Sequence, residues 1–244
     1  MNKIRIELDH PPSELLQAHR LKQITLEALL RTYDDLPEYS PPGSGTAAGL
    51  EEGQFFPGIQ ERDFAAYVYN KLAIRSELMV PYGKSGSCIL HMEMDYRWVD
   101  KKLNAGKMDI AFIDPREPIS WPKDGEVIEG LKVIGAIEFK RALTKPDKQM
   151  SSAFQSDLSR LKRLGARNPD SFFGMLIVPY TFPWSEDPDL RKQARFLKQI
   201  CASKSLGDRP NISLVVANYT PNRVIPYIHP FHGEEGFKDA LNFQ

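Results

Sequence analysis

Asp109 and the triplet Glu138-Phe139-Lys140 are the positions of this chain whose types and spacing could do chemistry. Asp109 opens one apolar run, in Lys-Met-Asp-Ile-Ala, and the triplet ends another. Because side chains alternate along a strand, Glu138 and Lys140 are expected on one face and Phe139 on the other. If the two runs are adjacent strands, two carboxylates and an ammonium group meet there. Neighbouring carboxylates repel unless a cation lies between them, so the pattern predicts a divalent-metal site beside a lysine, suited to cleaving phosphodiesters.

Glu61 is a candidate third acid, in a helix that the sequence predicts over residues 57–74. At about 100° per residue, it projects on the same side as Ala65, Val68 and Leu72. A carboxylate on such an apolar stripe is costly unless a metal or a lysine pairs with it. The alternative is that Glu61 only favours the helix dipole from the first turn. Beside Asp109 and Glu138, the pattern favours the site.

A basic segment follows the triplet. Residues 140–167 hold eight basic and two acidic residues, a net charge of +6. Such a segment beside a metal site could hold a phosphate backbone; the alternative is a solvated helix face. The candidate nucleic-acid-binding residues are Arg141, Lys145, Lys148, Arg160 and Arg163. Gln155, on the predicted helix, could point to the site or belong to a polar surface.

The elements that must position these residues are predicted from periodicity and turn signals. Helices are expected at residues 12–33, 57–74, 149–165 and 188–203, and strands at 76–81, 88–98, 107–113, 133–139, 172–178 and 212–219. This order indicates an α/β fold with a mixed central sheet flanked by helices. The composition of residues 35–54 predicts a linker or a mobile loop. We therefore expect residues 1–55 to form an N-terminal helical arm for dimerisation or for docking of partner proteins.

The candidate residues, together with the order of elements, resemble the PD-(D/E)xK, or restriction-endonuclease-like, nuclease superfamily. The resemblance covers about residues 56–220 and includes a core order of helix, three strands, helix and strand. It departs at Met108, which stands where the first motif has proline. It implies a restriction-endonuclease-like domain over residues 56–244. The residues that carry it are Glu61, Asp109, Glu138, Lys140 and Gln155.

The resemblance also implies a role for each residue. Asp109 and Glu138 would ligate Mg²⁺ or Mn²⁺, with the Phe139 carbonyl as a further ligand. Lys140 would orient or activate the attacking water, and Glu61 would complete the metal shell directly or through water. Gln155 would support the lysine or contact the substrate. Hard oxygen ligands suit Mg²⁺, and a bound metal lowers the pKa of its water.

Composition sets broad limits. The 244 residues are 41% hydrophobic and 26% charged, with 32 basic and 32 acidic side chains, as in an ordinary soluble protein. A neutral total argues against a protein that coats nucleic acid by charge alone, but it allows a local basic groove. The N-terminus lacks the apolar stretch of a signal peptide, and no run is long enough to span a membrane. We expect a cytoplasmic protein that does not bind membranes.

Three functions are compatible with these features. The leading hypothesis is a metal-dependent nuclease that hydrolyses DNA phosphodiesters, as a component of a defence, mobile-element or repair system by analogy. The alternative is a non-catalytic nucleic-acid-binding subunit that retains the nuclease fold, for which the basic segment argues. A third is a protein-interaction scaffold in which the acids form ordinary salt bridges.

Overall fold

The computed structural model describes residues 10–35, 61–83, 86–103, 106–116, 119, 128, 131–140, 148–180, 212–218 and 227–231. The elements are α1 (Ala18–Asp35), α2 (Glu61–Ala73), α3 (Ser76–Met79), β1 (Leu90–Asp95), η3 (Tyr96–Trp98), β2 (Lys107–Ile113), β3 (Val133–Phe139), α4 (Lys148–Arg167), β4 (Phe173–Tyr180), β5 (Ile212–Asn218) and β6 (Tyr227–Phe231). The predicted helix 188–203 and nearly all of the predicted linker 35–54 lie outside the described residues.

A mixed six-stranded sheet forms the centre of the molecule, with its strands in the order β1-β2-β3-β4-β5-β6. Strands β1, β2 and β3 are antiparallel neighbours. Strand β4 then pairs parallel to β3 and to β5, and β6 returns antiparallel to β5. The parallel step from β3 to β4 requires a crossover, which α4 provides. The prediction of a mixed sheet flanked by helices is confirmed.

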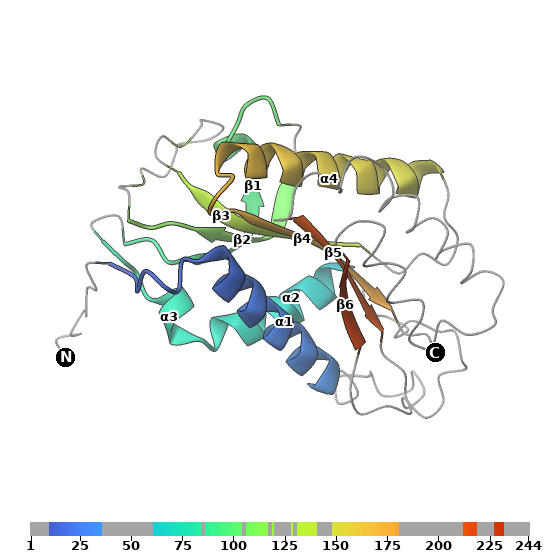
Figure 1. The fold of residues 1–244 in the computed structure, drawn as a ribbon, viewed down its shortest axis with the longest axis horizontal. Coiled ribbons are helices and arrows are strands. Elements are labelled where there is room, and N and C mark those ends of the chain that lie inside the picture. The colour runs from blue at the N-terminus through green and yellow to red at the C-terminus, as the bar shows by residue number, and fades with distance from the viewer. Residues whose placement is uncertain are drawn as a thin grey trace.

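The helices cover both faces of this sheet (Figure 1). Helices α1 and α2 pack on one face, and α4 lies alone on the other among the described helices. In α2 the buried side chains recur at helical spacing, at Phe64, Ala65, Val68 and Leu72, which is the stripe that the sequence predicted. Two hydrophobic clusters result, one on each side of the sheet.

The central strand β3 is buried along its whole length. Its apolar residues contribute to both clusters, since Ala136 belongs to the α4 side and Ile137 to the α1–α2 side. A strand that is covered on both faces reads as a continuous apolar run, as the sequence indicated. The predicted strands 107–113 and 133–139 are both confirmed with these bounds.

Two local predictions near β1 are wrong. Residues 76–79 form the one-turn helix α3, not a strand, and its only buried residue is Leu78. A run this short cannot be assigned to helix or strand from its apolar pattern. The predicted strand 88–98 begins at Leu90 and ends at Asp95, because the Asp95 carboxylate accepts a hydrogen bond from the Arg97 amide and starts the 3-10 turn η3.

The N-terminal helix also differs from its prediction. Residues 13–16 form a turn, with Leu15 N–H bonded to Pro12 O, and α1 begins only at Ala18. Its apolar face packs into the core that contains Phe139 and Val215. Helix α1 is therefore part of the central packing, and a division at residue 55 does not separate two hydrophobic cores.

None of the described helices is long and apolar enough to cross a membrane.

Candidate functional site

Sheet register brings Asp109 and Glu138 together. Strands β2 and β3 pair Ile110 with Ile137 and Ala111 with Ala136. Continuing this antiparallel register by one residue sets Asp109 opposite Glu138, and directly opposed side chains on a sheet lie close to each other. Glu138 is only 3% exposed. The two acids that the sequence singled out therefore lie side by side, at the end of β3 and the start of β2.

Phe139 separates the two halves of the triplet. Its ring packs against Phe64 of α2, with centroids 5.7 Å apart, on the face away from α4. Its backbone N–H donates to Asp109 Oδ2 at 2.7 Å. The predicted alternation thus holds at Phe139, and the main chain fixes the Asp109 side chain. The role of the Phe139 carbonyl as a metal ligand stays a prediction.

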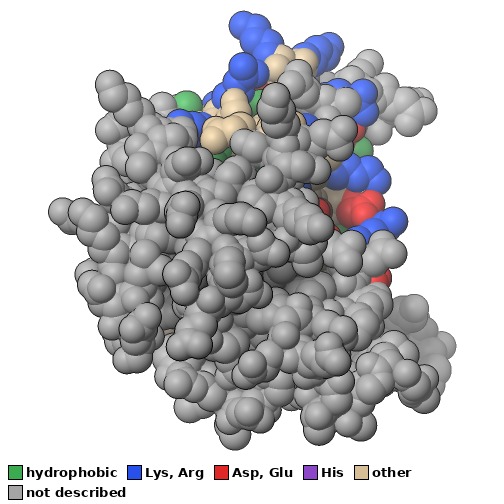
Figure 2. Space-filling view, turned by 90° about the vertical axis from the view of Figure 1, so that its right-hand side faces the viewer, with side chains coloured by type: hydrophobic (Ala, Val, Ile, Leu, Met, Phe, Trp, Pro, Cys, Tyr) green, Lys and Arg blue, Asp and Glu red, His purple; other side chains and the backbone are tan. Residues whose placement is uncertain are grey.

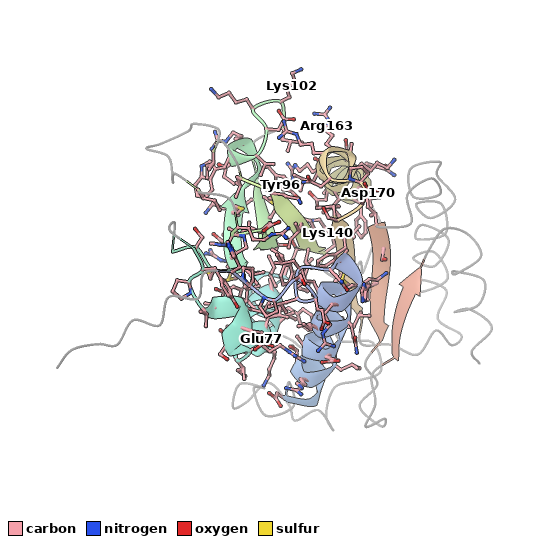
Figure 3. The ribbon with its side chains drawn as sticks, turned by 60° about the vertical axis from the view of Figure 1, so that its left-hand side comes forward. Glu77, Tyr96, Lys102, Lys140, Arg163 and Asp170 are labelled. Carbon is pink, nitrogen blue, oxygen red and sulfur yellow. The ribbon has the colours of Figure 1, made fainter. Side chains whose placement is uncertain are left out.

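Lys140 directly follows the end of β3, on the side of α4 toward the sheet (Figure 3). Its Nζ is 2.7 Å from Asp157 Oδ2 on α4 and 3.4 Å from Glu61 Oε1 on α2. Its own N–H donates to Ile177 O of β4 at 2.8 Å. The lysine therefore bridges the two helical layers across the sheet, held by an anion on each side.

Glu61 combines the two interpretations that the sequence left open. It is the first residue of α2, in an acidic first turn that favours the helix dipole. It also pairs with Lys140, and about a third of its side chain is exposed, 34%. Glu61 thus joins the candidate site through the lysine.

Burial and mutual repulsion raise the pKa values of the two central acids. Burial raises the pKa of Asp109 to about 6, helped by Glu61 and Asp157, while the Phe139 N–H and Lys140 oppose the shift. Burial, Asp109 and Asp157 raise the pKa of Glu138 well above its ordinary value, against a hydrogen bond from Tyr96. These are the shifts expected where carboxylates crowd one site without enough positive charge.

The pKa of Lys140 is also raised, and for a lysine this shift stabilises the charged form. Burial alone would lower its pKa, but the carboxylates of Asp157 and Glu61 outweigh that effect and raise it. The lysine is therefore a fixed positive charge in this arrangement. It is a counter-ion for the acids, and it would lose its proton only if a further cation neutralised those carboxylates.

Two residues that the sequence did not single out as candidates complete the arrangement. Asp157 is 4% exposed and pairs with both Lys140 and Arg160. Tyr96 is fully buried, and its hydroxyl donates to Glu138 Oε1. A signal existed for Asp157, since it falls between Phe154, Leu158 and Leu161 on the apolar stripe of its helix. That is the same argument that marked Glu61. No local signal marked Tyr96, whose partner is 42 residues away.

Gln155 lies elsewhere. It is exposed, whereas Phe154, Asp157 and Leu158 on the same helix are buried. Residues two apart on a helix point about 200° from each other, so the face that carries Asp157 to the lysine carries Gln155 away from it. The residue of α4 that contacts Lys140 is Asp157.

The basic residues of α4 hold the chain after η3 in place. Arg163 Nη1 donates to Lys102 O at 2.9 Å, at the outer edge of the α4 layer (Figure 3), and Arg160 pairs with Asp157. Arg163 remains exposed. Arg141 and Lys145 lie outside the described residues, as does the side chain of Lys148. Figure 2 shows Lys and Arg side chains gathered along the upper edge of the described surface, beside a few acids.

The donor set suits a hard divalent cation in chemistry. Carboxylate oxygens are the ligands that Mg²⁺ and Mn²⁺ accept, and Mg²⁺ needs only one or two carboxylates because it keeps waters. Within the described ranges, no group of three or more His, Cys, Asp or Glu side chains is arranged to hold a metal ion. Asp109 and Glu138 are the two acids that the sheet register sets side by side, and the lysine beside them is already paired.

Comparison of the chain with protein-family models, with curated proteins and with solved structures gave no match.

Proposed function

We propose that this protein is a metal-dependent nuclease that hydrolyses phosphodiester bonds in DNA. The observation that carries the proposal is the convergence of Asp109, Glu138 and Lys140 at one end of β3, with Glu61 beside the lysine. Two adjoining carboxylates with raised pKa values are costly to the fold. Such a cost is typical of functional sites.

Charge balance supports a divalent cation. Among the described residues, four carboxyl groups meet here, those of Glu61, Asp109, Glu138 and Asp157, and Lys140 and Arg160 pair with this group. Full ionisation would leave an excess of two negative charges, which is the charge that one Mg²⁺ neutralises. Cation binding would then lower the pKa values of Asp109 and Glu138.

The order of elements also supports the proposal. Helix α2, strands β1 to β3, helix α4 and strand β4 follow the sequence of helix, three strands, helix and strand. This is the order that the restriction-endonuclease-like resemblance implies, with Asp109 on the second strand and the triplet at the end of the third. We infer a restriction-endonuclease-like fold from these placements.

The residues would divide the work as follows. Asp109 and Glu138 would hold Mg²⁺ or Mn²⁺, with the Phe139 carbonyl as a further oxygen ligand and Glu61 completing the metal shell through water. The bound ion would supply an activated water and neutralise charge on the phosphoryl oxygens. Lys140, as a fixed cation, would orient that water or bind the scissile phosphate. The basic residues of 141–167 other than Arg160 would bind the flanking phosphates, which makes affinity salt-dependent.

A nuclease assay with the matched variants Asp109→Asn and Asp114→Asn tests the proposal. Asp114 is a buried carboxylate just after the other end of β2, paired with Arg116, and it is remote from the triplet. We expect cleavage of single-stranded or duplex DNA in Mg²⁺ or Mn²⁺ and none with a chelator. Asp109→Asn should reduce the rate by at least about 100-fold, since even changes behind a metal ligand cost about 10–100-fold. Asp114→Asn should keep the rate.

Two results would contradict the proposal. One is equal cleavage by wild type and Asp109→Asn, which would trace the activity to another site or a contaminant. The other is salt-sensitive DNA binding without turnover in any divalent metal, which would favour the non-catalytic nucleic-acid-binding subunit. Parallel RNA substrates decide between the two nucleic acids.

A further inference from the structure

Arg160 touches two side chains that lead to different residues of the candidate site. Its Nη1 is 2.8 Å from Asp157 Oδ1, and its Cζ lies 5.2 Å from the centre of the Tyr96 ring. Asp157 continues to Lys140, and Tyr96 continues to Glu138. One arginine on α4 thus begins two chains of contacts. We call them the first arm, through Tyr96 to Glu138, and the second arm, through Asp157 to Lys140.

The first arm constrains Glu138. The Tyr96 hydroxyl donates to its Oε1, so one carboxyl oxygen has a fixed partner. Tyr96 itself cannot shift freely, because its ring is buried and its N–H donates to Gly106 O at 3.1 Å. Arg160 covers the ring and lies against Gly106, where an added Cβ would be 3.1 Å from Arg160 Cζ. The orientation of Glu138 is therefore set from η3 and α4 together.

The second arm constrains Lys140. The two oxygens of Asp157 face different cations, with Oδ1 toward Arg160 and Oδ2 toward the lysine at 2.7 Å. Because Arg160 fixes the carboxylate, the carboxylate fixes the ammonium group. The Asp157 and Lys140 side chains are 5% and 17% exposed, so water does little to loosen this pair.

A gain in stability does not explain why these two arms contain buried ionic and hydroxyl groups. Buried ionic groups can usually be replaced by apolar side chains of similar volume without loss of stability, and often with a gain. Tyrosine at position 96 also carries a buried hydroxyl that phenylalanine would not. Both arms end on residues of the candidate site, where geometry has to be held within about 0.5 Å.

We propose that Tyr96 and Asp157 are positioning residues, Tyr96 for the metal-binding carboxylate of Glu138 and Asp157 for the ammonium group of Lys140, with Arg160 holding both. This rests on the proposed function for its kinetic consequences, while its structural consequences can be measured without turnover. The two arms are separate, so their variants should fail in different ways.

Tyr96→Phe tests the first arm by calorimetric titration with Mn²⁺ alone. Loss of the hydroxyl should weaken Mn²⁺ binding by about 10–100-fold, the usual effect of removing a partner behind a metal ligand. The matched control is Tyr82→Phe, since Tyr82 is equally buried and its hydroxyl donates to Glu77 O at 2.8 Å, outside the site. An effect of Tyr96→Phe no larger than that of Tyr82→Phe overturns the first arm, and so does a wild type that binds no Mn²⁺.

Asp157→Asn tests the second arm by NMR of the Lys140 side chain and by kinetics. The Lys140 ammonium and Cε signals should shift and broaden, while Mn²⁺ affinity falls less than in Tyr96→Phe, because Asp157 contributes its charge but does not hold Glu138. On DNA, kcat should fall by about 10–100-fold with KM unchanged, the signature of a group that acts in the transition state. Asp114→Asn is the matched control. Unchanged Lys140 signals overturn the second arm.

Arg160→Gln tests the link between the two arms, and it should both weaken Mn²⁺ binding and alter the Lys140 signals. The control Arg167→Gln, which removes contacts to Val99 O and Asp100, should do neither. An Arg160→Gln protein with wild-type Mn²⁺ affinity and Lys140 signals overturns the link. If wild type binds Mn²⁺ and the variants show the expected split in binding and NMR, yet no nucleic acid is cleaved, the nuclease proposal fails while the positioning roles stand.

Discussion

Lys140 Nζ lies 2.7 Å from Asp157 Oδ2, and this pair joins the end of the central strand to the helix that follows it in the chain. Both side chains are largely removed from water, at 17% and 5% exposure. Removing one partner of such a buried ion pair strongly lowers stability, because the remaining charge is left buried without a counter-ion. The relationship therefore links the candidate chemistry of the lysine to the stability of the fold.

We predict that Lys140→Met destabilises the protein by about 3 kcal/mol, the low end of the range for breaking a buried ion pair, since Arg160 still partners Asp157. The double variant Lys140→Met with Asp157→Asn should lose less than the sum of the two single variants, by about 1 kcal/mol or more. Urea unfolding of all four proteins measures this. The exposed pair Lys107 and Glu93 should give a coupling of only about 0.2–1 kcal/mol. Equal coupling in both cycles would refute the prediction.

Asp109→Asn should stabilise the protein at neutral pH. The folded state raises the pKa of this acid from 3.8 to about 6, so ionised Asp109 opposes folding above pH 6. Asparagine keeps an acceptor for the Phe139 N–H without the charge. We expect a gain on the order of 1–3 kcal/mol at pH 7.5, from about 1.4 kcal/mol per pKa unit. Thermal and urea unfolding check it, and a loss of stability in this variant would count against the raised pKa.

The same shift predicts a pH dependence. Between pH 3.8 and about 6 the folded state holds a proton on Asp109 that the unfolded state has released, so stability falls as pH rises through this window. The difference in unfolding free energy between wild type and Asp109→Asn should therefore shrink on acidification from pH 7 to pH 4. Parallel titrations of both proteins measure the contribution of Asp109 together with its effect on Glu138, whose pKa the Asp109 charge raises. A difference independent of pH would contradict the assignment to Asp109.

Gly135→Ala should weaken the sheet beside the site. A Cβ at this position of β3 would overlap the Phe173 ring on β4, and overpacking of a core costs about 1–3 kcal/mol. The companion change Phe173→Leu should relieve part of the loss. Gly174→Ala is the control, since its Cβ would meet Phe172 and Ile212 only at 3.2–3.3 Å. Chemical denaturation compares the variants, and an equal loss for both glycines would be inconsistent with this packing.

Ile24→Ala tests whether α1 belongs to the main fold. Ile24 is 1% exposed and shares a cluster with Phe139 and Val215, so truncation should cost about 2–5 kcal/mol in one cooperative transition. Leu26→Ala, at a partly buried position, should cost clearly less. A second, separate unfolding transition that responds to Ile24→Ala would instead identify α1 as an independent arm.

The elements that the sequence predicted correctly are those long enough to show a regular pattern of apolar residues. The sequence predicted the strands 107–113 and 133–139 from their apolar runs and the α2 stripe from its period of about 3.6, with neighbouring side chains on a strand pointing to opposite faces. The alternation that turns Phe139 away from Glu138 followed from the same rule. The segment 76–79 is too short to show a period, and it forms a helical turn where a strand was predicted.

By itself, then, the sequence determined which residues were available for chemistry and which local faces they would share. The tertiary structure alone decided their partners. Sheet register set Asp109 opposite Glu138, and the rotation of α4 brought Asp157 to Lys140 and left Gln155 exposed. The Tyr96 contact with Glu138 likewise depends on how two distant segments pack. The reason is physical: local periodicity encodes burial, whereas partner choice depends on the docking of elements far apart in the chain.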